Sequence, residues 1–448
     1  MRFLPHTDSD RAQMLARIGV ADISALFADI PSQFHLRPEA LNLPAAQHET
    51  AIQRSFAKAA AANRNGSDHR YFLGGGTYHH FIPAAVDYII SRGEFLTAYT
   101  PYQPEISQGT LQSLFEFQTM VARLTGMEVA NASMYDAATS VAEAALMARR
   151  VTRRKQIVAA TSVNPRYREV CRNYLSRLDG DYTEVTCEGY TTDIAALCAA
   201  VDGSTAAVIV QFPDFYGSLY DLAPLRAACD QHGALLVLAF SDASAFALIE
   251  SPGALGADIA VGSGQALGIP MGYGGPHIGL FTCKKKLVRQ LPGRVCGQTL
   301  DADGKRSFVL TLSTREQHIR REKATSNICS NQGLMCTAVA VYLSLLGDAG
   351  LHSVAQRSAA ALAQLIAGLP SSVHATEGAH YNETVLCFPD PDSRDRVLAK
   401  ALAHNIFAGI PLERIEQGAD RAALLVATSE MVEPEDIVQY LEVLNTAA

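Results

Sequence analysis

The residues best suited to chemistry lie where predicted strands end and predicted helices begin. Asp242 follows an apolar run over residues 235–240, at the carboxyl end of a predicted strand, where parallel sheets bind their ligands. A carboxylate in that place could hold a protonated ring nitrogen, although aspartates at strand ends also form turns. Residues 131–139 precede a predicted helix whose free N–H groups could bind a phosphate. Within this segment Ser133 and Asp136 are equally good N-caps, and capping alone would explain both.

Glycines and histidines form a second group of candidates. Residues 72–78 and 268–276 contain glycines that permit positive φ and close approach of a ligand, but tight turns use glycine for the same reason. Neither segment matches a nucleotide-binding motif. His79 and His80 are adjacent and point to different faces in regular structure, so we interpret them as loop histidines beside a possible pocket. Nine cysteines without a C-x-x-C pair indicate reduced thiols, and no metal site is predicted.

Three basic clusters have different interpretations. The cluster at residues 149–155 complements the negative end of a predicted helix and needs no other function. The cluster at residues 284–286 is typical of a solvated edge or turn. Only the third, at residues 315–323, lies in a polar run with few aromatic residues, and this cluster favours a binding role.

The composition of the 448-residue chain is that of a folded protein with two domains. Hydrophobic residues make up 48% and charged residues 18%, which is enough apolar material for compact cores. A net charge of −8 provides no positive field for nucleic acid. Residues 1–20 carry charges without a continuous apolar run, so we expect no signal peptide, no membrane span and a cytoplasmic location.

Short apolar strands alternate with helices through the middle of the chain. This alternation predicts βαβ units and a mostly parallel sheet in a doubly wound α/β domain. The expected strands are residues 156–160, 182–185, 206–212, 235–240 and 259–261, and the expected helices are residues 111–125, 137–150, 165–175, 193–200 and 222–232.

The two ends of the chain have other patterns. Prolines separate short helical segments near the N-terminus, which predicts a helical arm over residues 1–62. The large α/β domain is expected over residues 63–330. A small α+β domain is expected over residues 331–448, with helices at 334–346, 351–369, 393–404 and 434–444 and strands at 384–388 and 422–428.

Three polar runs carry a resemblance to a known family. They are YTPYQPEISQG at residues 99–109, RQLPGRV at residues 289–295 and TREQHIRREKATSNI at residues 314–328. These runs resemble the glycine decarboxylase (P-protein) family of the glycine cleavage system. The resemblance covers essentially the whole chain, and the length is similar to that of the first subunit of the two-subunit form.

The resemblance implies a pyridoxal-phosphate-dependent transferase fold of the aspartate aminotransferase class, in which active members attach the cofactor to a lysine. The corresponding place here is residues 262–270, where Gln265 stands in the lysine position. An amide cannot form a Schiff base, so no catalytic residue is expected in this chain. Asp242 lies 23 positions earlier, where the ring-nitrogen carboxylate of active relatives would be.

The family also implies partners and shared sites. The expected partners are a lysine-bearing second P-protein subunit in an α2β2 assembly, which holds the pyridoxal phosphate covalently, and the lipoylated H-protein, with glycine as substrate. Thr325, Ser326 and Asn327 would reach the partner's cofactor across the interface, or would cap a helix beginning near residues 328–332. Tyr99, Tyr102 and Arg315 are assigned to the substrate side or the channel.

Two other function classes stay open on the sequence. A stand-alone pyridoxal-phosphate decarboxylase or lyase would need another lysine to reach the cofactor, and Lys323 is the least implausible one. A non-catalytic scaffold subunit would keep the fold without needing the specific polar runs.

Overall fold

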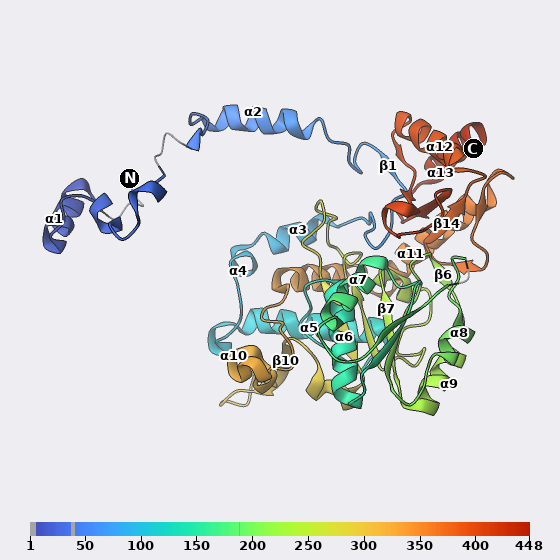
Figure 1. The fold of residues 1–448 in the computed structure, drawn as a ribbon, viewed down its shortest axis with the longest axis horizontal. Helices are drawn as coiled ribbons and strands as arrows, with labels where there is room; N and C mark the ends of the chain where they lie inside the picture. Colours follow the sequence, from blue (N-terminus) through green and yellow to red (C-terminus); the bar gives the residue numbers. More distant parts are fainter. Residues whose placement is uncertain (1–5, 37–40, 188) are drawn as a thin grey trace. The chain divides into compact units, whose positions relative to one another are not determined.

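The computed structural model describes residues 6–36, 41–187 and 189–448 in two compact units, Met1–Arg64 and Asn65–Ala448. The first unit contains helices α1 (Asp8–Ile18) and α2 (Glu49–Ala60), drawn in blue in Figure 1. A capping box between Thr7 and Asp10 starts α1. None of the residues described in this unit is buried, so these helices have no hydrophobic core of their own.

A seven-stranded sheet forms the centre of the second unit (Figure 1). Five strands from one edge to the middle run parallel to one another, the next strand, β9, runs antiparallel to them, and the other edge strand, β2, is paired antiparallel with β9. In spatial order the strands are β2 (Val129–Ala130), β9 (Gly279–Cys283), β8 (Ile259–Ser263), β7 (Leu235–Phe240), β5 (Thr205–Gln211), β3 (Gln156–Ala160) and β4 (Tyr182–Val185). Every residue of β5, β7 and β8 is buried, as expected for strands covered on both faces.

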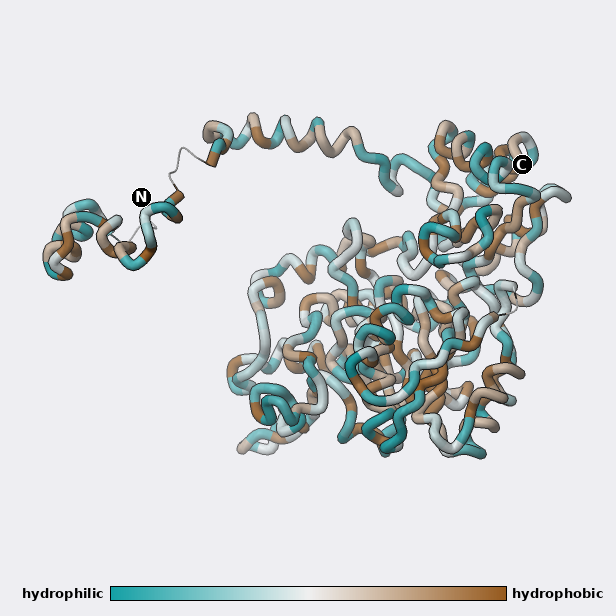
Figure 2. The backbone as a smooth tube through the Cα atoms, in the orientation of Figure 1, coloured by the Kyte–Doolittle hydropathy of each residue, from teal (hydrophilic) through white to brown (hydrophobic). Residues whose placement is uncertain are grey.

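Helices cover this sheet in the order that the sequence predicts. Helix α6 packs across β5, β7, β8 and β9, and helices α8 and α9 pack on β3, β5 and β7. Small buried side chains on α6, such as Ala144 and Ala145, allow close contact with the strands. The helices are α5 (Gln108–Thr125), α6 (Ala137–Thr152), α7 (Pro165–Leu175), α8 (Ile194–Ala199) and α9 (Ala223–His232). Figure 2, in which the backbone is coloured by residue hydropathy, shows segments of hydrophobic residues running through the centre of this unit.

Short elements precede and follow the strands of the sheet in the chain. They are α3 (Ala84–Ile90), α4 (Gly93–Leu96), α10 (Gln317–Arg320) and a hairpin of β10 (Val295–Leu300) and β11 (Arg306–Thr311). The next helix begins at Gly333, directly after residues 328–332, and its N-cap position is Gln332, whose side chain makes no capping hydrogen bond. The predicted capping of a helix there by Thr325, Ser326 or Asn327 is therefore wrong. Instead, the Ser326 hydroxyl accepts a hydrogen bond from the Ile328 amide at 3.1 Å, which forms a local turn.

Helix α11 (Gly333–Ala367) is interrupted at Gly347, which has φ 56° and ψ −169°. The two predicted helices at 334–346 and 351–369 therefore form, on either side of this break. By length and composition alone α11 is apolar enough to cross a membrane, with 39% of its most apolar window buried inside the structure. Core helices of soluble proteins meet the same criterion, so the finding is weak evidence for a membrane span.

The C-terminal residues form a second, four-stranded sheet with its own core. The strand order is β12 (His374–Ala375), β14 (Glu383–Cys387), β17 (Ala423–Ala427) and β16 (Ile410–Pro411). Helices α12 (Pro391–Ala403) and α13 (Pro434–Ala447) accompany it. Phe72, from far earlier in the chain, is buried in this core beside Tyr440. The predicted domain boundaries at 62/63 and 330/331 stay predictions.

Candidate functional site

The carboxyl end of β7 carries a buried carboxylate with three side-chain partners. Asp242 is 3% exposed. Its Oδ2 accepts from Asn382 Nδ2 at 2.8 Å and lies 3.2 Å from His80 Nε2. Its Oδ1 accepts from the Ser244 hydroxyl at 2.6 Å. Burial by itself would raise the pKa of Asp242, but the charge and hydrogen bond of His80 and the Ser244 bonds hold the pKa below its ordinary value.

His80 bridges two carboxylates. Its Nδ1 lies 2.7 Å from Glu430 Oε2, opposite the contact with Asp242, and its side chain is 2% exposed. Both ring nitrogens face acceptors, so both carry a proton and the ring is an imidazolium. Burial opposes that charge, yet Asp242 and Glu430 raise the pKa of His80 to about 10. His80 lies in a loop, as interpreted from the sequence, but it is buried and paired with two carboxylates.

The lysine position after β8 holds a fully bonded amide. Gln265 is 2% exposed, and its Oε1 accepts from the Tyr78 amide at 2.9 Å. Its Nε2 donates to the carbonyls of Tyr78 and Ile269 at 3.0 and 2.8 Å. The amide oxygen and both amide hydrogens thus have protein partners, which is typical of a structural residue.

A second buried carboxyl group lies beside the same segment. Glu383 Oε1 accepts from the Gly75 amide at 2.6 Å, and Oε2 accepts from the Tyr78 hydroxyl at 2.7 Å. Burial raises the pKa of Glu383 to about 8, against the effect of these two hydrogen bonds. A group with this pKa keeps its proton near neutral pH, which reduces the negative charge around His80.

The N-terminus of α6 is capped by side chains of its own segment. Asp136 Oδ1 accepts from the Thr139 amide at 2.8 Å, and a capping box is complete. Ser133 is not the cap: it has φ 83°, and its hydroxyl accepts from the Gln332 amide at 3.0 Å. The carboxylate of Asp136 therefore occupies the anion position at this helix end.

Tyr99 and Tyr102 lie outside this buried cluster. Tyr99 is 81% exposed and Tyr102 57% exposed. The buried guanidinium of Arg294 lies 5.3 Å from the centre of the Tyr102 ring and 3.3 Å from its hydroxyl. Arg294 also lies 3.6 Å from the buried carboxylate of Glu316. The buried Arg294 guanidinium thus fixes the position of the exposed Tyr102 ring.

Arg315 and Thr325 are joined through the main chain. The Thr325 amide donates to the Arg315 carbonyl at 2.9 Å. The guanidinium of Arg315 is bonded to the carbonyls of Leu291, Gly293 and Leu312, so its donors shape the backbone here. Thr325 and Ser326 are half-buried, and Asn327 is exposed. The structure places these residues apart from Gln265, and their predicted roles stay predictions.

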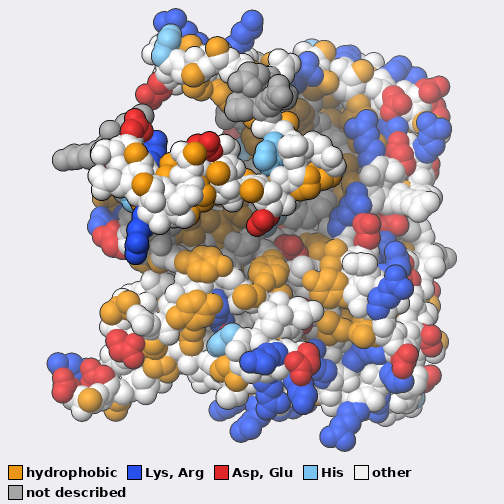
Figure 3. Space-filling view, turned by 60° about the vertical axis from the view of Figure 1, so that its left-hand side comes forward, with side chains coloured by type: hydrophobic (Ala, Val, Ile, Leu, Met, Phe, Trp, Pro, Cys, Tyr) orange, Lys and Arg blue, Asp and Glu red, His pale blue; other side chains and the backbone are white. Residues whose placement is uncertain are grey.

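Several apolar side chains near Tyr99 and Tyr102 in the sequence are also exposed to solvent. Figure 3 shows hydrophobic side chains gathering over one face of the molecule. The exposed large apolar side chains of α3, α4, α10 and the segment between α4 and α5 are Tyr88, Leu96, Tyr99, Tyr102, Ile106 and Ile319. We call this set the aromatic face. Apolar groups in such numbers on a surface are typical of an interaction site.

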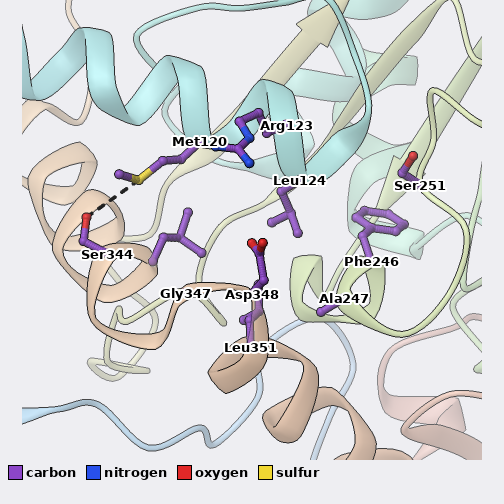
Figure 4. Close-up of a pocket in the computed structure, with 11 residues that line it drawn as sticks. Met120, Arg123, Leu124, Phe246, Ala247, Ser251, Ser344, Gly347, Asp348 and Leu351 are labelled. Carbon is purple, nitrogen blue, oxygen red and sulfur yellow. Dashed lines mark hydrogen bonds between the residues drawn. The ribbon is translucent and has the colours of Figure 1, made fainter.

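Two cavities lie in the second unit. The larger, about 640 Å³, lies at the Gly347 break of α11 and is lined by α5 and the loop after β7 (Figure 4). Among the described residues, Arg123 and Asp348 are the only charged ones that line it, and none of its lining is shared with the cavity of about 390 Å³ beside His80 and Gln265. Among the residues described, no three His, Cys, Asp or Glu side chains gather as a metal site.

The fold and the site together indicate the class of protein. A mostly parallel sheet with an aspartate after one strand and the lysine position after the next is the arrangement of pyridoxal-phosphate enzymes. A glutamate decarboxylase from Lactobacillus brevis has this fold at 12% identity and a TM-score of 0.66, with 95% of this chain and 96% of that chain covered.

Residues 1–444 match the model of the glycine cleavage system P-protein, and the chain belongs to this family. A protein of Methylocella silvestris named probable glycine dehydrogenase (decarboxylating) subunit 1 is 46% identical over 100% of both chains. A protein of the same name from Rhodospirillum rubrum is 48% identical over 97% of each. A crystal structure of glycine decarboxylase (P-protein) in inhibitor-bound form is 41% identical, with a TM-score of 0.89 over 100% of both chains.

The residues present in the pocket do not fit a covalently held pyridoxal phosphate. Gln265 supplies no amine, and Asp242 is already paired with His80. All eight lysines of the chain lie among the described residues, and none of them is buried. Sequence reasoning missed His80, Glu383 and Glu430. The glycine-rich segment before His80 was the one available signal, because it allows the backbone to enter a pocket.

Proposed function

We propose that this chain is the lysine-lacking subunit of a glycine dehydrogenase (decarboxylating), the P-protein of the glycine cleavage system. One observation carries the proposal: a chain that matches the family over nearly its whole length holds a fully bonded glutamine, Gln265, in the lysine position. In the proposed enzyme the partner subunit binds pyridoxal phosphate covalently, and this chain completes the partner's site.

The cofactor, when bound, accepts the electron pair that remains when the Cα–carboxylate bond of glycine breaks and CO2 leaves. The aminomethyl group then passes to the lipoyl disulfide of the H-protein. This chain supplies a wall of the site and part of the entry. The exposed rings of Tyr99 and Tyr102 offer flat apolar contact for substrate or the lipoyl arm, and binding between fixed groups favours reaction by orienting the reactants.

Thr325, Ser326 and Asn327 form the proposed polar contribution to the partner's cofactor. Support for this assignment comes from their anchoring, because the Thr325 amide is bonded to Arg315, whose guanidinium is in turn fixed by backbone carbonyls. A hydroxyl on such a rigid segment loses little entropy when it binds a phosphate oxygen. The proposed assembly is a cytoplasmic α2β2 heterotetramer that meets the lipoylated H-protein.

The aromatic face supports the choice of a partner subunit. Its members belong to short elements between residues 84 and 320 and carry large apolar side chains in contact with water. Tyrosine and isoleucine are typical of surfaces that become buried on association. A lysine-bearing second subunit is the proposed occupant.

Reconstitution tests the proposal. The full-length chain and a lysine-bearing P-protein subunit are purified separately and assayed, alone and mixed, for glycine-dependent exchange of labelled bicarbonate in the presence of H-protein. We expect exchange only in the mixture. Exchange by this chain alone would establish a stand-alone enzyme, for which the exposed Lys323 is the candidate. Full exchange by the partner alone would make this chain a scaffold.

A further inference from the structure

Part of the pocket beside Asp242 and Gln265 is occupied by the chain itself, next to the cavity of about 390 Å³ described above. Residues 74–81, which we call the strap, run across the carboxyl ends of β7 and β8. The Tyr78 amide and carbonyl are both bonded to Gln265, and His80 is bonded to Asp242. The carbonyl of Gly75 accepts from Asn164 Nδ2 at 3.2 Å. The strap thus meets residues that follow β3, β7 and β8, three strands of the parallel sheet.

The contacts of the strap correspond to those of a cofactor. In pyridoxal-phosphate enzymes an acidic side chain pairs with the protonated ring nitrogen and a lysine holds the ring. Here Asp242 pairs with the protonated His80, and Gln265 holds the Tyr78 main chain. We propose that the strap is a permanent internal occupant of this pocket, in which the His80 imidazolium replaces the cofactor's pyridinium, so that this chain takes up no pyridoxal phosphate.

A second row of contacts joins the strap to the C-terminal sheet. Glu383 of β14 receives hydrogen bonds from Gly75 and Tyr78. The Glu430 carboxylate accepts hydrogen bonds from His80 Nδ1 and from the Phe81 amide, the latter at 2.7 Å. A cofactor would have to displace bonds on both sides at once. The strap also fixes the C-terminal sheet against the parallel sheet, which keeps the chain in one arrangement for its partner.

The glycines before His80 are required for this path. A side chain on Gly74 would place its Cβ 2.1 Å from Glu383 Oε1, and one on Gly76 would place it 2.8 Å from Asn164 Nδ2. Gly76 also has φ 105°, which other residues rarely adopt. Asp136 puts a carboxylate at the start of α6, where it repels a phosphate.

The first test uses the unaltered full-length chain. Equilibrium dialysis with pyridoxamine 5′-phosphate measures the pocket alone, because this compound carries no aldehyde and cannot react with surface lysines. We expect no saturable binding up to millimolar concentration. Saturable binding of one molecule per chain would overturn the proposal, since the strap would then be displaceable.

The second test replaces the proposed internal cation. His80→Ala should lower the Tm by about 5 °C or more, because it leaves two buried carboxylates without their shared partner. Imidazole, added at tens of millimolar, should restore much of the lost Tm by entering the vacated place. His79→Ala is the matched control: its imidazole ring is half-buried and pairs with no carboxylate in the described structure, so imidazole should not raise its Tm.

Three results would contradict the role of His80. An unchanged Tm of His80→Ala, or an equal effect of imidazole on both variants, would show that no cation is needed in this place. The third is saturable binding in the dialysis with the unaltered chain, which remains decisive even where His80→Ala fails to fold.

Discussion

The strap region and the aromatic face differ in how completely their polar and apolar groups are partnered. Around His80, every charged group has a partner inside the chain, and the side chains are excluded from water. Around Tyr99 and Tyr102, large rings lie in solvent above a buried arginine. The first region resembles a finished core, whereas the second resembles half of an interface. This difference supports our proposal that the chain's own pocket is structural and that its contribution to function lies on the outer face.

The largest expected effect is the loss of stability in Asp242→Ala. This change leaves His80 and Asn382 without their buried acceptor, and breaking a buried ion pair in this way costs about 3–5 kcal/mol. Urea unfolding of the chain measures the loss. Asp202→Ala, which removes an exposed turn carboxylate, is the control and should cost about 1 kcal/mol or less. Equal losses in both variants would erase the contrast between core and surface.

The second effect is a fall in stability at alkaline pH. His80 has a pKa raised from 6.5 to about 10, and Glu383 has one raised from 4.5 to about 8. For each group the folded chain binds its proton more tightly than the unfolded chain. The resulting stability is fully present below the unfolded pKa and is lost as pH rises through the folded pKa.

Between pH 7 and pH 9 the two groups together should lower the free energy of unfolding by about 2–4 kcal/mol. Denaturant titrations at several pH values measure this slope. The lowered pKa values of Asp242 and Glu430 act only in acid and do not contribute in this range. A flat profile from pH 7 to pH 9 would contradict the charged state assigned to His80.

Much of the fold could be predicted because its signals are local. Runs of Val, Ile and Leu predicted the buried strands, and β3, β4 and β7 begin and end at the predicted residues. The start of α11 was predicted to within one residue, but its capping was not. Thr325, Ser326 and Asn327 are as suitable for turns as for caps, and only the path of the chain decides between the two.

The buried site could not be predicted in the same way. His80 meets its two carboxylate partners across 162 and 350 residues of sequence. No local pattern records such a contact, so an adjacent pair of histidines gave no reason to separate His80 from His79. Asp242 and Gln265 were located because strand ends and family motifs mark them, but their partners became visible only in the structure.

The third effect concerns the polar residues near the aromatic face. Replacing both Thr325 and Ser326 by alanine should weaken pyridoxal phosphate binding to the assembled enzyme about tenfold or more. A charge-assisted hydrogen bond is worth about 1.5–3 kcal/mol, and 1.4 kcal/mol corresponds to one decade. Titration of the cofactor into both complexes measures the change, with thermal melts alongside. A lower Tm with unchanged cofactor affinity would make these residues structural only.

The smallest expected effect is weaker subunit association in Tyr99→Ala. Because the ring is 81% exposed in this chain, its loss should leave the Tm of the isolated chain unchanged. Truncation of an aromatic side chain at an interface costs about 1–2 kcal/mol of binding, which corresponds to roughly a tenfold higher Kd. Val438→Ala serves as the control, because it shortens another exposed apolar side chain, in α13. Equal Kd values for both variants would separate Tyr99 from the interface.

The central claim is that this chain completes a cofactor site held by its partner and has none of its own. Reduction of the assembled enzyme with borohydride in the presence of pyridoxal phosphate, followed by peptide mass mapping, tests this claim most directly. The stable adduct should appear on one lysine of the partner subunit, while all eight lysines of this chain stay unmodified at matched cofactor concentration. A specific, stoichiometric adduct on any lysine of this chain would contradict the account.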